Sequence, residues 1–154
     1  MMRRRSGGWR GSAAVATLER AIELAARAHA GQRDKGGHPY ILHPLRVMMV
    51  MNTDAQRMAA VLHDIVEDTP VTFEDLLAEG FSVEVVDAVR ALTKHTGETR
   101  VDAARRIVRN PVARAVKLAD IADNMDLSRI PNPTTRDLER LREYESARGI
   151  LLAG

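Results

Sequence analysis

Apolar residues recur at helical spacing along most of the chain, and no segment alternates apolar and polar residues with period two for long. Leu18, Ile22 and Ala25 form one such stripe near the start. Aromatic residues make up only 3% of the sequence. A core must therefore consist of Leu, Val, Ile, Met and Ala, and this mix favours helices over sheets. The sequence predicts an all-α fold, and its 154 residues suit a single domain.

Capping and breaking residues divide the chain into about seven to eight helices. Asp54 is expected to cap a helix, Thr72 and Asp75 resemble a capping box, and Ser82 is a third cap. Asn110-Pro111 marks a boundary between two further helices. The predicted helices cover roughly residues 14–30, 43–51, 55–67, 72–79, 82–93, 101–109, 111–127 and 135–152.

Charge and composition exclude several classes of function. Four of the 23 basic residues lie in a predicted flexible basic tail over residues 1–13, so residues 14–154 hold 19 basic and 21 acidic residues. This part of the chain is therefore not a basic nucleic-acid domain. No apolar run approaches the roughly 18 residues of a membrane span, and the start lacks the apolar region of a secretory signal. We therefore expect a cytoplasmic protein without membrane contact. The sequence is compatible with a homo-oligomer but specifies none. The absence of cysteine excludes disulfides and Cys-type zinc sites.

The predicted helix over 55–67 ends in His63-Asp64-Ile65-Val66-Glu67-Asp68. At about 100° per residue, His63, Asp64, Glu67 and Asp68 fall within roughly 140° of one another. A solvated charged face would carry lysines or arginines at i+4 spacing, and this stripe has none. Three carboxylates without a local cation repel one another, and a divalent cation would relieve that repulsion. We therefore favour a metal site over a solvated face.

Two further segments hold candidate ligands. Asp120 and Asn124 lie four residues apart and share a helix face, although a polar helix surface explains them equally well. His43 opens the helix after a polar loop rich in glycine, where its ring could point into a cleft or serve the structure alone. Two imidazoles and two carboxylates form a mixed nitrogen and oxygen donor set, which suits Mn²⁺, with Zn²⁺, Fe²⁺ or Co²⁺ as competitors.

Three motifs resemble the HD hydrolase domain of the Rel/SpoT alarmone enzymes: GQRDKGGHPYILHPL, AAVLHDIVEDT and VKLADIADNM. The resemblance covers about residues 25–127 and implies a helical HD-domain bundle over residues 14–154 that uses one divalent ion, usually manganese. It further implies removal of the 3′-pyrophosphate from (p)ppGpp, an alarmone of the stringent response. Because no synthetase domain fits in the remaining residues, we expect a hydrolase-only protein of the small alarmone hydrolase type.

The resemblance also assigns roles to single residues. His43, His63, Asp64 and Asp120 match the metal ligands. Glu67 and Asp68 match the acidic pair that orients and deprotonates the attacking water. The positions that match substrate-binding residues are Lys35, Lys94, Asn124 and Tyr144.

Three positions depart from the family pattern. Asp34 stands where relatives often have an arginine that stacks on guanine, Ile121 replaces the arginine of KLADR, and Asp123 replaces the histidine of HNM. A carboxylate in place of an arginine plane removes a stacking cation. Other nucleotides, such as (p)ppApp, NADPH, a dNMP or a cyclic nucleotide, are therefore alternative substrates. A non-catalytic nucleotide-binding regulatory module is a further alternative, but a pure binder has no use for the Glu67-Asp68 pair.

Overall fold

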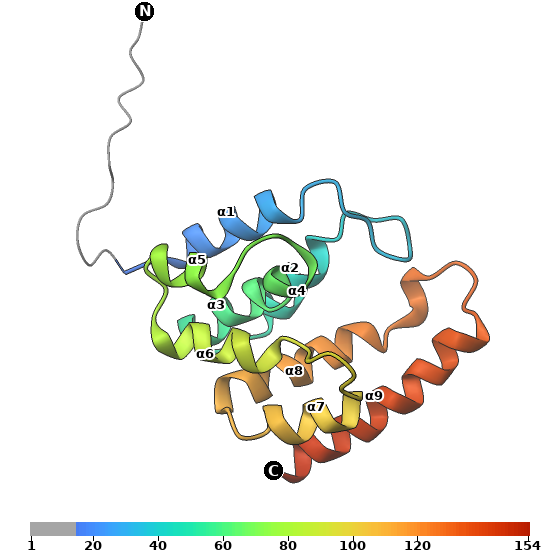
Figure 1. Cartoon of the computed structure of the whole chain (residues 1–154). Coiled ribbons are helices and arrows are strands. Elements are labelled where there is room, and N and C mark those ends of the chain that lie inside the picture. Colours follow the sequence, from blue (N-terminus) through green and yellow to red (C-terminus); the bar gives the residue numbers. More distant parts are fainter. Residues whose placement is uncertain (1–14) are drawn as a thin grey trace, which may run out of the picture.

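The computed structural model describes residues 15–154, and the predicted basic tail over 1–13 lies outside them. Figure 1 shows helices throughout this described part, which holds one isolated β-bridge between Arg33 and Pro39 but no strand. The expected all-α fold is confirmed. The helices are α1 (Leu18–Ala28), α2 (Leu42–Met49), α3 (Asp54–Leu62), α4 (Ile65–Asp68), α5 (Phe73–Ala78), α6 (Val83–Leu92), α7 (Arg100–Ile107), α8 (Pro111–Asn124), the 3₁₀ turn η1 (Leu127–Arg129) and α9 (Thr135–Ala153).

The starts of α5 and α6 are set by the capping residues that the sequence indicates. Thr72 and Asp75 form a reciprocal capping box on α5, and Gly80 follows that helix with φ +95°. Ser82 caps α6. The prediction that Asp54 caps α3 was wrong by one residue: the Thr53 hydroxyl accepts from the backbone N–H of Gln56, and Asp54 is the first helical residue.

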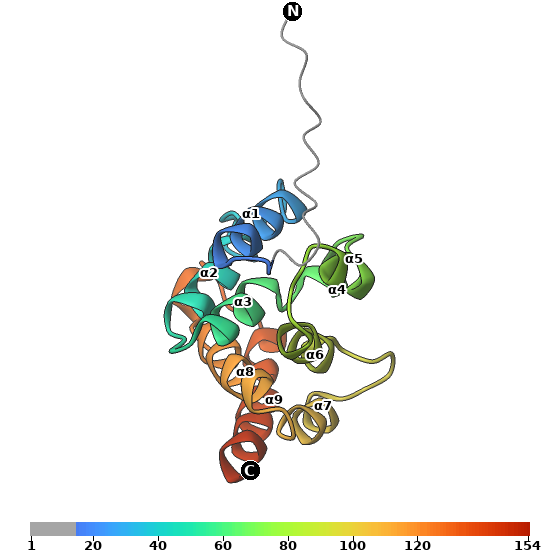
Figure 2. The ribbon, with the colours of Figure 1, turned by 90° about the vertical axis from the view of Figure 1, so that its left-hand side faces the viewer.

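Helix α3 occupies the centre of the fold and contacts α1, α2, α6 and α8. Its last residues, Val61 and Leu62, are fully buried. Ala21 and Ala25 of α1 and Ala59 of α3 are also fully buried, so these two helices pack through side chains that are short enough to bring the backbones close. Figures 1 and 2 place α7 and α9 together at the end of the molecule opposite α1. Because α2, α3 and α8 contact one another, side chains on α2, on α8 and at the end of α3 meet beside the core.

The predicted continuous helix over 55–67 was wrong in one respect that matters for the site. Helix α3 ends at Leu62, His63 and Asp64 form a turn, and α4 restarts at Ile65. The Asp64 backbone has φ −101° and ψ −1°, which departs from the values of about −63° and −42° of a regular α-helix. The His63 ring Nδ1 approaches the Ala60 carbonyl oxygen at 2.5 Å, so side-chain contacts compete with the helical pattern there. The angles expected of one straight helix therefore do not hold across His63-Asp64.

No helix within residues 15–154 combines the length and apolar character needed to cross a membrane.

Candidate metal centre

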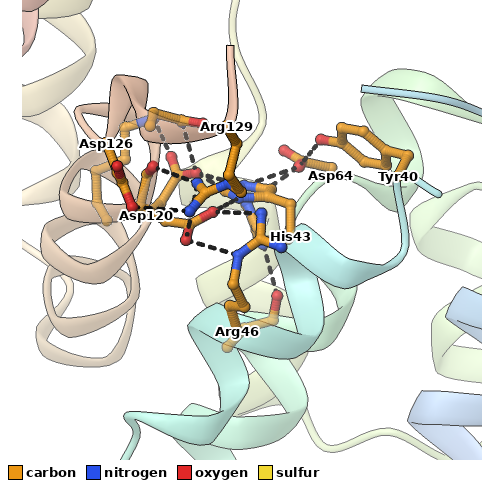
Figure 3. A network of polar contacts seen from close by, with 12 residues as sticks. Tyr40, His43, Arg46, Asp64, Asp120, Asp126 and Arg129 are labelled. Atoms are coloured by element: carbon orange, nitrogen blue, oxygen red, sulfur yellow. Dashed lines mark hydrogen bonds and ion pairs between the residues drawn. The ribbon is translucent and has the colours of Figure 1, made fainter. Parts of the chain in front are cut away.

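The four predicted metal ligands come together from three separate segments: His43 on α2, His63 and Asp64 in the turn after α3, and Asp120 on α8. His43 Nε2 lies 2.9 Å from Asp120 Oδ1, and His63 Nε2 lies 3.3 Å from the same oxygen. Asp64 Oδ2 lies 3.1 Å from His63 Nε2 and 3.8 Å from His43 Nε2. Figure 3 shows His43, Asp64 and Asp120 facing one another. Ligand atoms of His43, His63 and Asp120 lie within 4.8 Å of one another, close enough to bind one ion.

Each imidazole presents Nε2 to this cluster because its Nδ1 is engaged elsewhere. His63 Nδ1 contacts the Ala60 carbonyl oxygen, and His43 Nδ1 lies 2.6 Å from Asp123 Oδ2. Both partners can only accept a hydrogen bond, so Nδ1 must carry the proton in each ring. Nε2 of each ring therefore faces the carboxylates and is the nitrogen that would bind a cation, as in metal-ligating histidines whose other nitrogen is held by an acceptor.

Both carboxylates also have fixed partners. Asp120 Oδ2 accepts from Lys117 Nζ at 2.9 Å, and Asp120 Oδ1 accepts from Asn124 Nδ2 at 3.1 Å. The Tyr40 hydroxyl donates to Asp64 Oδ2. Asp120 is buried, whereas the Asp64 side chain is partly exposed at 16%. These contacts orient the oxygens toward the imidazole nitrogens.

The electrostatics of the cluster favour positive charge. Burial opposes ionisation of Asp120, but Lys117 and the imidazoles outweigh it and hold the pKa of this carboxyl well below its usual range. Burial also opposes protonation of His63, yet Asp64 and Asp120 raise its pKa well above the ordinary value. Two ionised carboxylates therefore attract cationic charge to the ring nitrogens, and a divalent cation fits this donor set.

The two predicted catalytic acids lie on α4 but differ in position. Glu67 lines a cavity of about 190 Å³ together with His63, Asp64 and Asp120. Burial, followed by the charges of Asp64 and Asp68, raises the pKa of the Glu67 carboxyl. Asp68 is not among the residues that line this cavity, although burial and the charge of Asp64 raise its pKa as well. The structure thus brings Glu67, more directly than Asp68, to the candidate metal centre.

The four predicted substrate-binding residues line two cavities, which share the ligand candidate His43. The first, of about 300 Å³, is lined by Lys35, and the second, of about 190 Å³, by Lys94. Asn124 and Tyr144 line both. Lys35 also forms an ion pair with Asp137 at 3.0 Å, so its ammonium group is already engaged.

The second cavity is rich in cationic side chains. Lys94, Arg100, Arg106 and Lys117 line it beside the predicted ligands. The guanidinium of Arg100 lies 4.6 Å from the centre of the Tyr144 ring and stacks on it. This cavity can therefore accommodate a strongly anionic group next to the candidate metal centre.

The residues that depart from the family pattern have identifiable structural roles. Asp34 Oδ1 accepts from the backbone N–H groups of Gly36 and His38, both at 2.9 Å, so this side chain stabilises the loop that it belongs to. Ile121 is fully buried in the core. Asp123 contacts His43, as described above.

Sequence reasoning missed the residues that form hydrogen bonds to the predicted ligands, namely Lys117, Tyr40 and Asp123. Lys117 lies three residues before Asp120, so helical spacing on α8 could have identified this pair. No comparable signal exists for Tyr40 and Asp64, or for Asp123 and His43, because each pair joins segments that are distant in sequence.

Comparisons with known proteins show the family to which this chain belongs. Residues 21–122 match the HD domain family. A GTP pyrophosphokinase of Streptomyces coelicolor is 37% identical over 146 residues, which cover 87% of this chain and 16% of that protein. A guanosine-3′,5′-bis(diphosphate) 3′-pyrophosphohydrolase of Vibrio cholerae is 38% identical over 125 residues, covering 72% of this chain and 18% of that protein. The chain thus spans less than a fifth of the length of these relatives.

One similar solved structure has a length close to that of this chain. It is described as a metazoan ortholog of SpoT that hydrolyses ppGpp and plays a role in starvation responses. The two structures superpose with a TM-score of 0.73 at 26% sequence identity, covering 92% of this chain and 88% of that one. The fold of this chain therefore matches that structure over nearly its full length.

Proposed function

Since this chain belongs to the HD domain family, we propose that it is a metal-dependent phosphohydrolase that removes the 3′-pyrophosphate from a (p)ppGpp-like nucleotide in the cytoplasm. The observation that carries the proposal is the convergence of His43, His63, Asp64 and Asp120 at the junction of two cavities. The names of the Vibrio cholerae relative and of the metazoan structure support the choice of substrate.

HD domains bind a divalent metal, and the donor chemistry here fits one. Two imidazole nitrogens and two carboxylates leave room for water in the coordination sphere, and we propose Mn²⁺ as the native ion because it accepts such mixed ligands. When bound, the ion would supply Lewis-acid stabilisation of the phosphoryl charge and would ease deprotonation of water.

The remaining steps belong to side chains of this protein. Water attacks the phosphorus attached to the ribose 3′ oxygen, and the bond between that phosphorus and the 3′ oxygen breaks. The water oxygen becomes part of the released pyrophosphate, and the 3′ oxygen leaves as a hydroxyl group after gaining the proton that water lost. We assign Glu67 as the base that takes the proton from water, because its carboxylate lines the cavity with the ligands. Asp68, at the end of the same helical turn, is proposed to help orient Glu67 and the water.

The cationic residues of the second cavity are suited to the substrate phosphates. Lys94 and Arg100 would neutralise the charge that the pyrophosphate carries, whereas Arg106 is held by Glu98 and by the backbone carbonyl oxygens of Ala91 and Thr93. Asn124, Tyr144 and Lys35 line the first cavity and would contact the nucleoside. Lys35 must exchange its ion pair with Asp137 for the substrate, which costs little because the Lys35 side chain is 54% exposed.

A substrate screen tests this proposal. Purified protein with Mn²⁺ is incubated with ppGpp and with ppApp, and pyrophosphate release is measured, with Asp64→Ala as the blank. We expect pyrophosphate from at least one of the two and none from the blank. Absence of turnover on both nucleotides in a protein that binds Mn²⁺ would contradict the proposed substrate class.

A second candidate is hydrolysis of another nucleotide, such as NADPH, a dNMP or a cyclic nucleotide, and the observation that favours it is Asp34. Its carboxylate is tied to the loop backbone, so this position offers no guanidinium to stack on guanine. Analysis of products separates the candidates, because inorganic phosphate or a nucleoside monophosphate would replace pyrophosphate. Introducing Asp34→Arg should shift base preference toward guanine, and an unchanged preference would remove Asp34 from base selection.

A further inference from the structure

We propose that Asp123, clamped between Arg46 and Arg129, is the positioning residue that fixes His43 as an Nε2 metal ligand. This inference rests on the metal-dependent function proposed above and concerns the position at which the chain departs from the HNM pattern of the Rel/SpoT enzymes. It assigns a role to three residues that lie outside the ligand set.

The contact between Asp123 and His43 is direct and shielded from solvent. Asp123 Oδ2 lies 2.6 Å from His43 Nδ1, and His43 Nε2 lies 2.9 Å from Asp120 Oδ1 on the opposite side of the ring. The His43 side chain is 7% exposed and that of Asp123 13%. Because Asp120 and Asp123 lie three residues apart on α8, they share one face of the helix and hold the two nitrogens of the same imidazole.

Two arginines hold the Asp123 carboxylate in place. Arg46 donates through Nε to Asp123 Oδ1 at 2.8 Å and through Nη2 to Oδ2 at 3.1 Å. Arg129 lies 3.3 Å from Oδ1 and also donates to the backbone carbonyl oxygen of Asp123 at 2.9 Å. Figure 3 shows Arg46 and Arg129 directed into the network around His43. Both oxygens are thus engaged, so the carboxylate cannot rotate away from the ring without losing charged hydrogen bonds.

The chemical consequence follows from what a carboxylate can do. Ionised Asp123 only accepts hydrogen bonds, so His43 must place its proton on Nδ1 and present the Nε2 lone pair to Asp64 and Asp120. The negative charge behind the ring also makes Nε2 a stronger donor to a cation. The guanidinium groups of Arg46 and Arg129 on the same carboxylate favour its ionised form.

A purely architectural role is the competing explanation, because Asp123 also links α2, α8 and η1. Metal affinity separates the two roles, since an architectural ion pair would change stability without changing binding by the folded protein. Outer partners of metal-ligating histidines typically contribute about 10- to 100-fold to metal affinity. We therefore measure binding of Mn²⁺ alone, without nucleotide.

The experiment is calorimetric titration of chelator-stripped protein with Mn²⁺, on the wild type, Asp123→Ala and Asp123→Asn. We expect Asp123→Ala to weaken binding about 10- to 100-fold and Asp123→Asn to weaken it less, because an amide oxygen can still accept from Nδ1. The matched control is Asp126→Asn, which makes the same chemical change in a residue that pairs with Arg129 at 3.0 Å but is not in contact with His43. Its affinity should match the wild type.

A second readout follows the ring itself. In Zn²⁺-loaded wild type, nitrogen NMR of the histidine rings should show the His43 proton on Nδ1, and this signal should be lost in Asp123→Ala. Mn²⁺ affinity of folded Asp123→Ala within threefold of the wild type would overturn the inference. If Asp123→Ala does not fold, Asp123→Asn decides: a weakening of at least threefold supports the inference, and a smaller change overturns it. A wild-type protein that binds no Mn²⁺ would instead refute the proposed metal-dependent function.

Discussion

Replacing Asp64 with alanine separates metal binding from folding. Asp64 Oδ2 accepts from Tyr40 and faces the Nε2 atoms of His63 and His43 at 3.1 and 3.8 Å. Without the ion, the variant loses the acceptor of a partly buried hydroxyl, which costs about 1–2 kcal/mol. Relief of the repulsion between Asp64 and Asp120 offsets part of that cost. The ion-free variant should therefore stay helical and melt slightly below the wild type.

The effect of Mn²⁺ should differ much more between the two proteins. A ligand at 100 times its Kd stabilises the native state by about 2.7 kcal/mol. For a domain of this size, each kcal/mol shifts Tm by about 2–4 °C, so the wild type should gain about 5–11 °C. If Asp64→Ala raises the Kd 100-fold, the same Mn²⁺ concentration contributes only about 0.4 kcal/mol, or about 1–2 °C.

The assay is thermal unfolding followed by circular dichroism, with chelator and with a series of Mn²⁺ concentrations. Asp102→Ala is the control, because it removes a carboxylate that is 56% exposed and pairs with Arg105 on its own helix. This control should show the wild-type shift. An equal Mn²⁺-dependent shift in Asp64→Ala would refute the reasoning that Asp64 is a ligand.

Three further substitutions test other parts of the structure. Glu67→Gln should lower the rate of pyrophosphate release about 10²- to 10⁴-fold while the Mn²⁺-dependent Tm shift persists, and an unchanged rate would exclude Glu67 as the base. Arg106 lowers the pKa of Glu98 to about 2, so the pair stabilises the fold above about pH 4.5, and that stability is lost as pH falls toward 2. Glu98→Gln should therefore cost about 1–2 kcal/mol in urea unfolding at pH 7 and less at pH 3, whereas a cost independent of pH would contradict this pairing. Leu62→Ala empties a fully buried site and should cost about 3–5 kcal/mol by the same method, and a cost below about 1 kcal/mol would mean that the core is not packed there.

The helix positions could be predicted because their signals are local. The first free N–H groups of α5, α6 and α8 are satisfied by Thr72, Ser82 and Asn110, and each of these caps accepts from a residue only three positions away. A capping residue of this kind acts in the same way wherever the rest of the fold allows a helix. The boundaries that they mark were therefore correct to within a few residues.

The break at His63-Asp64 could not be predicted in this way. The segment contains neither Gly nor Pro, and its apolar residues keep helical spacing through Val66. The turn follows contacts that no local pattern encodes, among them those of His63 and Asp64 with Asp120 on α8 and His43 on α2. Tertiary interactions outweighed helix propensity at the two residues on which the site depends.

The four candidate ligands could be predicted from the sequence, whereas the residues around them could not. His43, His63, Asp64 and Asp120 belong to motifs, so the resemblance to a known family singled them out, and the structure brings their side chains together. The ion pair between Lys35 and Asp137 joins residues about a hundred positions apart and depends on how α9 packs. The loop-stabilising role of Asp34 is different, because its partners Gly36 and His38 are close in sequence; it was missed because this position was compared only with a family arginine.

A crystal grown with Mn²⁺ and measured at the manganese absorption edge provides the most direct test of the metal centre. A single anomalous peak should lie about 2.0–2.3 Å from Nε2 of His43, Nε2 of His63 and one oxygen each of Asp64 and Asp120. A peak bound through Nδ1, a peak elsewhere in the protein, or no peak at this junction of α2, α3 and α8 would contradict a metal centre built from these four residues.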